Sequence, residues 1–287
     1  MHFSAEYILS ECREQAVTIS EFFRQTEAEL VGLSPEELDD KMLEVLEIMS
    51  LSSEKGLEKP IFSLSGMTGG FAHKAWQHRK HQPLMGEFVM GAVAKALSTS
   101  ELNASMGKIV AAPTAGASGI LPAALSSARE KMNLQTEELL PGLYTAGAIG
   151  KIVALEATIS GADGGCQAEC GTAAAMAAAG LTELMRGSPE QCFHAAGMAL
   201  IHIMGLVCDP IAGFVEFPCS LRNASGLVNA FVSADLAMAG IESLVPFDQV
   251  VDAMYRVGKM LPEALRETAL GGIASSPAAK QLEKKYL

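Results

Sequence analysis

The stretch CDPIAGFVEFPC, residues 208–219, places two cysteines eleven residues apart, with a proline near each of them. Pro210 and Pro218 fix their own φ angles and push the residues before them away from helical geometry. We therefore predict a bent, irregular loop that can turn both sulfurs toward one point.

A second cysteine-bearing segment, GADGGCQAECG, lies upstream at residues 161–171. Its glycines allow the backbone around Cys166 to approach a bulky group closely. We interpret Cys166, Cys208 and Cys219 as the ligands of one metal centre. The spacing alone leaves a second interpretation open, because free cysteines are often small core residues. In addition, these intervals match neither a zinc ribbon nor a ferredoxin run.

Composition sets limits on the class of protein. The 287 residues suffice for one large domain or two ordinary ones. Hydrophobic residues make up 49% of the chain but aromatic residues only 6%, so we expect a core of small side chains between closely packed helices. The net charge of −12 argues against nucleic acid or an anionic membrane as a partner.

The cysteine content bears on the compartment. Six cysteines occur in a sequence in which we recognise no secretory leader, which favours a reducing cytoplasm over a disulfide scaffold. The uncharged run 109–128 is interrupted by Pro113 and Pro122, so we expect no membrane-spanning segment there.

Apolar residues recur at helical spacing along most of the chain, and no alternating run competes with them. We therefore predict an all-α fold, a compact helical domain with glycine- and proline-rich active-site loops. Residues 1–58 are expected to be peripheral N-terminal helices packed on the domain formed by residues 59–287.

Several helix boundaries can be predicted from local signals. Residues 4–30 are expected to form one helix capped by Ser4, and the Ser34-Pro-Glu-Glu sequence is a clear helix start. Towards the C-terminus we expect a helix over residues 262–270 and then a polar tail.

Two loops rich in serine, threonine and glycine follow apolar runs, at residues 63–70 (SLSGMTGG) and 113–119 (PTAGASG). Their hydroxyls and backbone N–H groups suit an anion such as a carboxylate or phosphate. Either loop alone also fits an ordinary turn, but two in one chain favour an anion pocket. Ser118 is expected to cap the helix that follows the second loop.

The cysteine segments and the loops together resemble a known family. SLSGMTGG (63–70), SMGKIVAAPTAGASGILPA (105–123), GADGGCQAECGTAAAMAAAG (161–180) and CDPIAGFVEFPCSLRNASG (208–226) are similar to segments of the α chain of iron–sulfur-dependent bacterial L-serine dehydratase. The resemblance runs from about residue 60 to 270. It implies a lyase that deaminates L-serine to pyruvate and ammonia.

The resemblance also implies the cofactor and the partner. It assigns a [4Fe-4S] cluster to Cys166, Cys208 and Cys219, with one iron left open as a Lewis acid on the substrate hydroxyl. Cys12, Cys170 and Cys192 fall outside the pattern, and we interpret them as structural. A separate regulatory β chain is implied as a partner, and a homo-oligomer stays open.

The substrate and base residues are less specific. We expect hydroxyls and N–H groups of the two loops to hold the substrate carboxylate: Ser65, Gly66, Thr68, Thr114, Gly116 and Ser118. Arg222 and Asn223 follow Cys219 closely and are expected to orient the carboxylate or the cluster, although Arg222 equally fits a structural ion pair. The candidate general bases are Lys108, His73 and Glu169, and a residue of the β chain is an equal alternative.

Three other functions compete with this interpretation. The same cluster chemistry can act on L-cysteine or L-threonine, which the motifs do not distinguish from serine. A non-catalytic iron–sulfur sensor would not need the two anion-type loops. A pyridoxal-phosphate lyase would leave the three cysteines without a role, and we find no resemblance to those enzymes.

Overall fold

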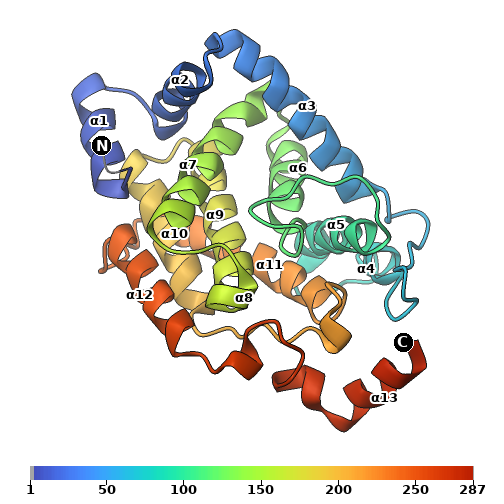
Figure 1. Ribbon diagram of the computed structural model, residues 1–287. Helices are drawn as coiled ribbons and strands as arrows, with labels where there is room; N and C mark the ends of the chain where they lie inside the picture. The colour runs from blue at the N-terminus through green and yellow to red at the C-terminus, as the bar shows by residue number, and fades with distance from the viewer. Residues whose placement is uncertain (1–2, 287) are drawn as a thin grey trace.

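The computed structural model describes residues 3–286 and confirms the all-α prediction (Figure 1). Within these residues there is no β-strand, and only two isolated β-bridges occur, one of which joins Cys208 to Arg266. The α-helices are α1 (Ala5–Gln15), α2 (Ile19–Val31), α3 (Pro35–Glu54), α4 (Phe71–His78), α5 (Gly86–Ala104), α6 (Ile120–Met132), α7 (Leu140–Glu156), α8 (Gly161–Gly164), α9 (Thr172–Leu184), α10 (Pro189–Ile203), α11 (Cys219–Met238), α12 (Phe247–Met260) and α13 (Pro277–Tyr286).

The centre of the molecule is α9, whose residues Thr172–Glu183 are all buried. Helices α6, α7, α10 and α11 pack around it. Its small side chains allow close approach: a Cβ added to Gly180 would lie 2.6 Å from the carbonyl oxygen of Gly142 on α7. The low aromatic content of the sequence therefore corresponds to a core of closely spaced, alanine-rich helices.

The prediction of one helix over residues 4–30 is wrong, because this segment forms α1 and α2. Ser4 does cap α1, and its hydroxyl accepts a hydrogen bond from the Tyr7 N–H. The helix ends at Ala16, which adopts a left-handed conformation. A new helix then starts at Thr18, whose side chain forms a reciprocal capping box with Glu21.

Helix α3 begins as predicted at Ser34, which forms a capping box with Glu37. Buried side chains of α1, α2 and α3 belong to the same hydrophobic core as those of α9. Phe23 of α2, for example, packs at Gly147 of α7, where an added Cβ would lie 2.8 Å from the ring.

Two further local predictions are wrong. The Ser118 hydroxyl donates to the Ala115 carbonyl at 2.7 Å, and α6 starts after Gly119 without a side-chain cap. The predicted helix over residues 262–270 is only a short 3-10 turn, because Glu267 and Ala269 adopt positive φ angles of 64° and 56°.

The predicted polar tail forms α13, which lies near the start of α11 and the loop before it. Ser276, which precedes Pro277, accepts hydrogen bonds at the start of this helix from the N–H groups of Ala279 and Lys280. A serine followed by proline is the same start signal that correctly predicted α3.

Among residues 3–286, one stretch, Glu137–Glu156, is long and apolar enough to cross a membrane by length and composition, and more than half of its apolar part is buried inside the protein. It comprises a 3-10 turn followed by α7, which packs between α2 and α9. These properties fit a core helix of the bundle.

Candidate functional site

The first cysteine segment is built around a sharp bend after α8. Gly165 has a φ of +78°, and a Cβ there would lie 2.8 Å from the Leu206 carbonyl oxygen, so only glycine fits. Cys166 follows, and Gln167–Gly171 forms a π-helical turn, a feature that often occurs at functional sites. The side-chain amide of Gln167 donates to the carbonyls of Gly164 and Met254, both at 2.9 Å, which fixes the turn.

The second segment places Cys208 against the chain that follows α12. The Cys208 N–H donates to the Leu265 carbonyl at 2.9 Å, and the Glu267 N–H donates to the Cys208 carbonyl at 2.7 Å. Both backbone polar groups of Cys208 are therefore hydrogen-bonded to a segment more than fifty residues downstream.

Cys219 is the first residue of α11 and is 8% exposed. The predicted irregular loop therefore ends where this helix begins. The N-terminus of a helix carries a partial positive charge that favours an anionic sulfur.

The three predicted ligand cysteines influence one another electrostatically. Burial raises the pKa of Cys219 to about 12, and the negative charges of Cys166 and Glu169 add to this effect. Burial and the charge of Cys166 likewise raise the pKa of Cys208 far above its ordinary value. The pKa of Cys166 is lowered, chiefly by a hydrogen bond from Cys170, while burial opposes this effect.

This donor set fits a cationic metal group. Three buried thiols that interact electrostatically cannot all ionise unless a positive charge compensates them, and a coordinated thiol loses its proton outright. Among residues 3–286 no three His, Cys, Asp or Glu side chains are arranged to hold one metal ion.

The other cysteines divide into two groups. Cys170 is buried and hydrogen-bonded to Cys166, and it also interacts with Cys219, so it lies on the same side as the predicted ligands. Cys12 and Cys192 instead interact with Glu183. All six cysteines of the chain are free and buried.

Glu169, one of the three predicted bases, lies directly at this centre. Its Oε1 accepts a hydrogen bond from the Thr114 hydroxyl at 2.8 Å, and its Oε2 lies 3.9 Å from the Cys208 sulfur. Burial raises its pKa, and the negative charge of Glu267 adds to this effect. Gly161 leaves room for the contact, because a Cβ there would lie 2.5 Å from Oε2 and 2.9 Å from the Cys208 sulfur.

The other two predicted bases lie apart from these residues. Lys108 is exposed and lines a cavity formed with α3 residues and Leu102. The Nδ1 atom of His73 lies 2.9 Å from the Leu57 carbonyl oxygen. Neither side chain forms a hydrogen bond with a cysteine in the described part of the chain.

Arg222 carries the positive charge of the centre. Its Nη2 donates to Asp209 at 2.6 Å, and its guanidinium interacts with Cys166 and Cys219. Its Nη1 is buried and has no hydrogen-bond partner among the described residues. The structure thus contains the expected ion pair and, in addition, one unused donor on a guanidinium that interacts electrostatically with two of the thiols.

Asn223 is fully buried and already has three hydrogen bonds. Its Nδ2 donates to the carbonyls of Gly116 and Cys219 at 2.7 and 2.9 Å, and its Oδ1 accepts from the Gly119 N–H at 2.8 Å. It therefore fastens the Thr114–Gly119 loop to the start of α11.

The predicted anion-binding hydroxyls donate to glutamates. Ser65 Oγ donates to Glu216 Oε2 at 2.7 Å, and Thr68 Oγ1 lies 3.5 Å from the same oxygen. Gly66, between them, turns the loop with a φ of +75°. The second loop uses its Thr114 hydroxyl for Glu169 in the same way, so both loops contact the cysteine-bearing segments through carboxylates.

Backbone donors in the second loop are still free. The N–H groups of residues 114–117 make no hydrogen bond to any described residue. Successive free N–H groups of this kind can form a concave anion site.

The sequence reasoning missed three acidic residues of this region: Asp209, Glu216 and Glu267. Asp209 and Glu216 lie inside the cysteine loop of residues 208–219, and two acidic residues in an otherwise apolar segment indicate a functional or structural role. No sequence pattern indicates Glu267, because its position depends on how the downstream segment pairs with Cys208.

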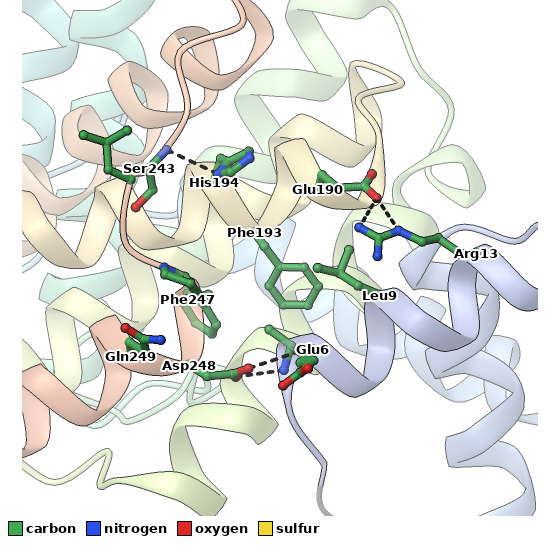
Figure 2. A pocket seen from close by; sticks show the side chains of 13 residues that line it. Glu6, Leu9, Arg13, Glu190, Phe193, His194, Ser243, Phe247, Asp248 and Gln249 are labelled. Atoms are coloured by element: carbon green, nitrogen blue, oxygen red, sulfur yellow. Dashed lines mark hydrogen bonds and ion pairs between the residues drawn. The ribbon is translucent and has the colours of Figure 1, made fainter.

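A cavity of about 650 Å³ lies elsewhere, between α1, α10 and the start of α12 (Figure 2). Its walls include Leu9, Phe193 and Phe247, and Arg13 pairs with Glu190 at its edge. None of the site residues predicted from the sequence lines it.

The fold and the site define an all-helical protein whose buried centre combines thiols, carboxylates and one arginine. The sequence model of the family described as "Serine dehydratase alpha chain" matches residues 14–274. The chain belongs to this family.

Individual relatives extend over nearly the whole chain. It is 47% identical over 285 residues to the "L-serine dehydratase, alpha chain" of Peptoniphilus asaccharolyticus. The aligned region covers 99% of this chain and 98% of the relative. It is 46% identical over 274 residues to the "Probable L-serine dehydratase, alpha chain" of Bacillus subtilis, covering 95% of this chain and 91% of the relative. The "L-serine dehydratase" of Mycobacterium tuberculosis is 36% identical over 98% of this chain, which spans 62% of that relative.

Proposed function

We propose that the chain is the catalytic α subunit of an L-serine ammonia-lyase and holds a [4Fe-4S] cluster through Cys166, Cys208 and Cys219. The observation that carries the proposal is the grouping of these buried, mutually interacting thiols beside Glu169 and Arg222. All of them fall within the segment that matches serine dehydratase alpha chains. The names of the relatives support serine as the substrate.

When bound, the cluster would supply one iron without a cysteine ligand, and such an iron acts as a Lewis acid on the substrate hydroxyl. The protein has to hold the amino acid in place for this chemistry. Arg222 Nη1, the free N–H groups of residues 114–117 and those of Ser65 and Gly69 are donors available to the substrate carboxylate.

Glu169 is the general base of the proposal, because it alone of the three predicted candidates contacts a ligand cysteine and one of the two loops. Its carboxylate takes the α-proton and passes it to the departing hydroxyl, which leaves as water, so that the base is regenerated. The resulting 2-aminoacrylate tautomerises to the imine, which water hydrolyses to pyruvate and ammonia. The net reaction consumes only serine.

We further propose a separate regulatory β chain as the partner and the cytoplasm as the compartment. The word "alpha" in the names of two near-full-length relatives supports a second chain. The M. tuberculosis relative, of which this chain spans 62%, has room for such a part in one polypeptide. Six buried free cysteines suit a reducing compartment.

An anaerobic pyruvate-release assay tests the proposal, with L-serine, L-threonine and L-cysteine compared in the presence and absence of a β chain. We expect serine to give the highest kcat/KM, together with a broad visible absorption that air bleaches. An air-stable preparation without iron that releases pyruvate at the same rate would refute the cluster. Iron and the absorption without activity on any of the three substrates would favour the sensor function.

A further inference from the structure

Glu216 is a buried carboxylate without a positively charged partner. The residue is 5% exposed, and its Oε2 is held by the hydroxyls of Ser65 and Thr68. No lysine, arginine or histidine of residues 3–286 forms an ion pair with it. Its Oε1 makes no hydrogen bond within the same residues, so one oxygen is left to accept a donor.

Other buried carboxylates near the centre are compensated differently. Asp209 pairs with Arg222 at 2.6 Å, and Glu101 accepts the N–H groups of Phe71 and Ala72 at the positive end of α4. A buried charge is costly unless it is paired. Glu216 has only two neutral hydroxyls as partners among the described residues, so its negative charge has no cationic partner there.

The position of Glu216 links it to the proposed substrate site. It lies three residues before Cys219, and its donors come from one of the two serine- and threonine-rich loops. Its neighbour Val215 contacts the other loop, where a Cβ added to Gly116 would lie 3.3 Å from the valine side chain. Adjacent residues of the cysteine loop therefore contact both loops.

We propose that Glu216 binds the α-ammonium group of the amino-acid substrate. The inference rests on the proposed function and completes it, because the free carboxylate is complementary to the one cationic group of a small amino acid. An ammonium group carries three N–H donors and no acceptor, so it matches an oxygen that lacks a donor. Glu216 thereby selects 2-amino acids against 2-hydroxy acids of the same shape.

A matched pair of ligands tests this assignment. L-Glycerate differs from L-serine in having a hydroxyl in place of the ammonium group. We compare the KM for L-serine with the inhibition constant of L-glycerate in the anaerobically purified holoenzyme and in Glu216→Gln. The KM for serine should rise on the order of ten- to a hundredfold, the size of a hydrogen bond to a charged group, while the inhibition constant of glycerate changes less than twofold. Calorimetric binding of L-alanine, which has no hydroxyl to lose, should weaken in parallel with serine.

Glu183→Gln is the control. Glu183 is also buried and is held by the Ser20 hydroxyl and the Cys192 thiol, but it lies on α9 away from both loops. This variant should leave both ligand constants unchanged. Glu216→Asp retains the charge at a shorter reach and gives a second measurement if the glutamine variant loses its cluster. It should weaken serine binding partly and leave glycerate unaffected.

Equal weakening of serine and glycerate in Glu216→Gln would overturn the inference and assign Glu216 to support of the Ser65–Gly70 loop. No change in either constant would place the ammonium group elsewhere and overturn it as well. Failure of the proposed function is distinguishable, because the unsubstituted holoenzyme would then release no pyruvate from serine at all.

Discussion

Replacement of Asn223 separates a structural role from a role in substrate binding. Asn223→Ala removes the partners of the Gly119 N–H and the Gly116 carbonyl, both tied to its buried amide. Each buried polar group left unpaired costs about 1–3 kcal/mol. Because water can enter part of the vacated space, we expect a loss of about 3 kcal/mol in the free energy of unfolding. This corresponds to a fall in Tm of about 6–10 °C.

The assay is urea unfolding of the anaerobically purified protein, followed by circular dichroism, with kinetics on serine measured in parallel. Ser225→Ala is the control on the same helix, because its exposed hydroxyl bonds only to the Arg222 carbonyl and a change within about 0.5 kcal/mol is expected. Asn223→Asp should destabilise more than Asn223→Ala, since it places a carboxylate against two carbonyls. A stable Asn223→Ala variant with only a raised KM for serine would refute the structural role.

Three other predictions concern the centre and its surroundings. Cys170→Ala should retain the iron content of the unsubstituted protein, whereas Cys208→Ala should lose iron; equal loss in both, measured by iron analysis, would show that Cys170 is a ligand. Glu169→Gln should lower kcat at least about a hundredfold, the usual contribution of a general base, with the visible absorption unchanged; activity close to the unsubstituted level would assign the base elsewhere. Burial raises the pKa of Glu101 above its ordinary value, so the folded protein holds this proton more tightly than the unfolded chain. Its contribution to stability is then complete below the ordinary glutamate pKa and declines as the pH rises through the folded value. Urea unfolding of Glu101→Gln between pH 4 and 7 should show a correspondingly flatter profile, and an unchanged profile would contradict this sign.

Local signals in the sequence predicted many helix boundaries. Ser34, the predicted start of α3, forms a capping box with Glu37, and Ser188-Pro189 shows the same signal at the start of α10. Such signals are local because side-chain caps act within a few residues of the backbone they satisfy. The break at Ala16 was missed although Thr18 and Glu21 carry the same type of signal. Apolar residues recur at helical spacing on both sides of the break, so the pattern alone predicts one continuous helix.

The sequence indicated which segments form the candidate site, but not how their individual groups pair. The two loops and the cysteine segments do contact one another, as Thr114 with Glu169 and Ser65 with Glu216 show. Glu267 could not be found, since its approach to Cys208 depends on a pairing between segments far apart in the sequence. Such contacts are set by tertiary packing and leave no local period.

The hydroxyls of the two loops show that a residue type alone does not predict the hydrogen-bond partner. A serine or threonine hydroxyl has one proton to donate, and in Ser65 and Thr114 that proton already goes to a glutamate oxygen. A substrate carboxylate in contact with these loops can therefore be held only by donors that are still free. In the described residues the free donors include Arg222 Nη1, the N–H groups of residues 114–117 and, in the first loop, the N–H groups of Ser65 and Gly69. The glutamates then have a second consequence, because they place negative charge where an ammonium group needs it. A zwitterion with its carboxylate at the backbone donors and its ammonium at a glutamate would use both kinds of unpaired group, whereas a simple carboxylic acid would use only one.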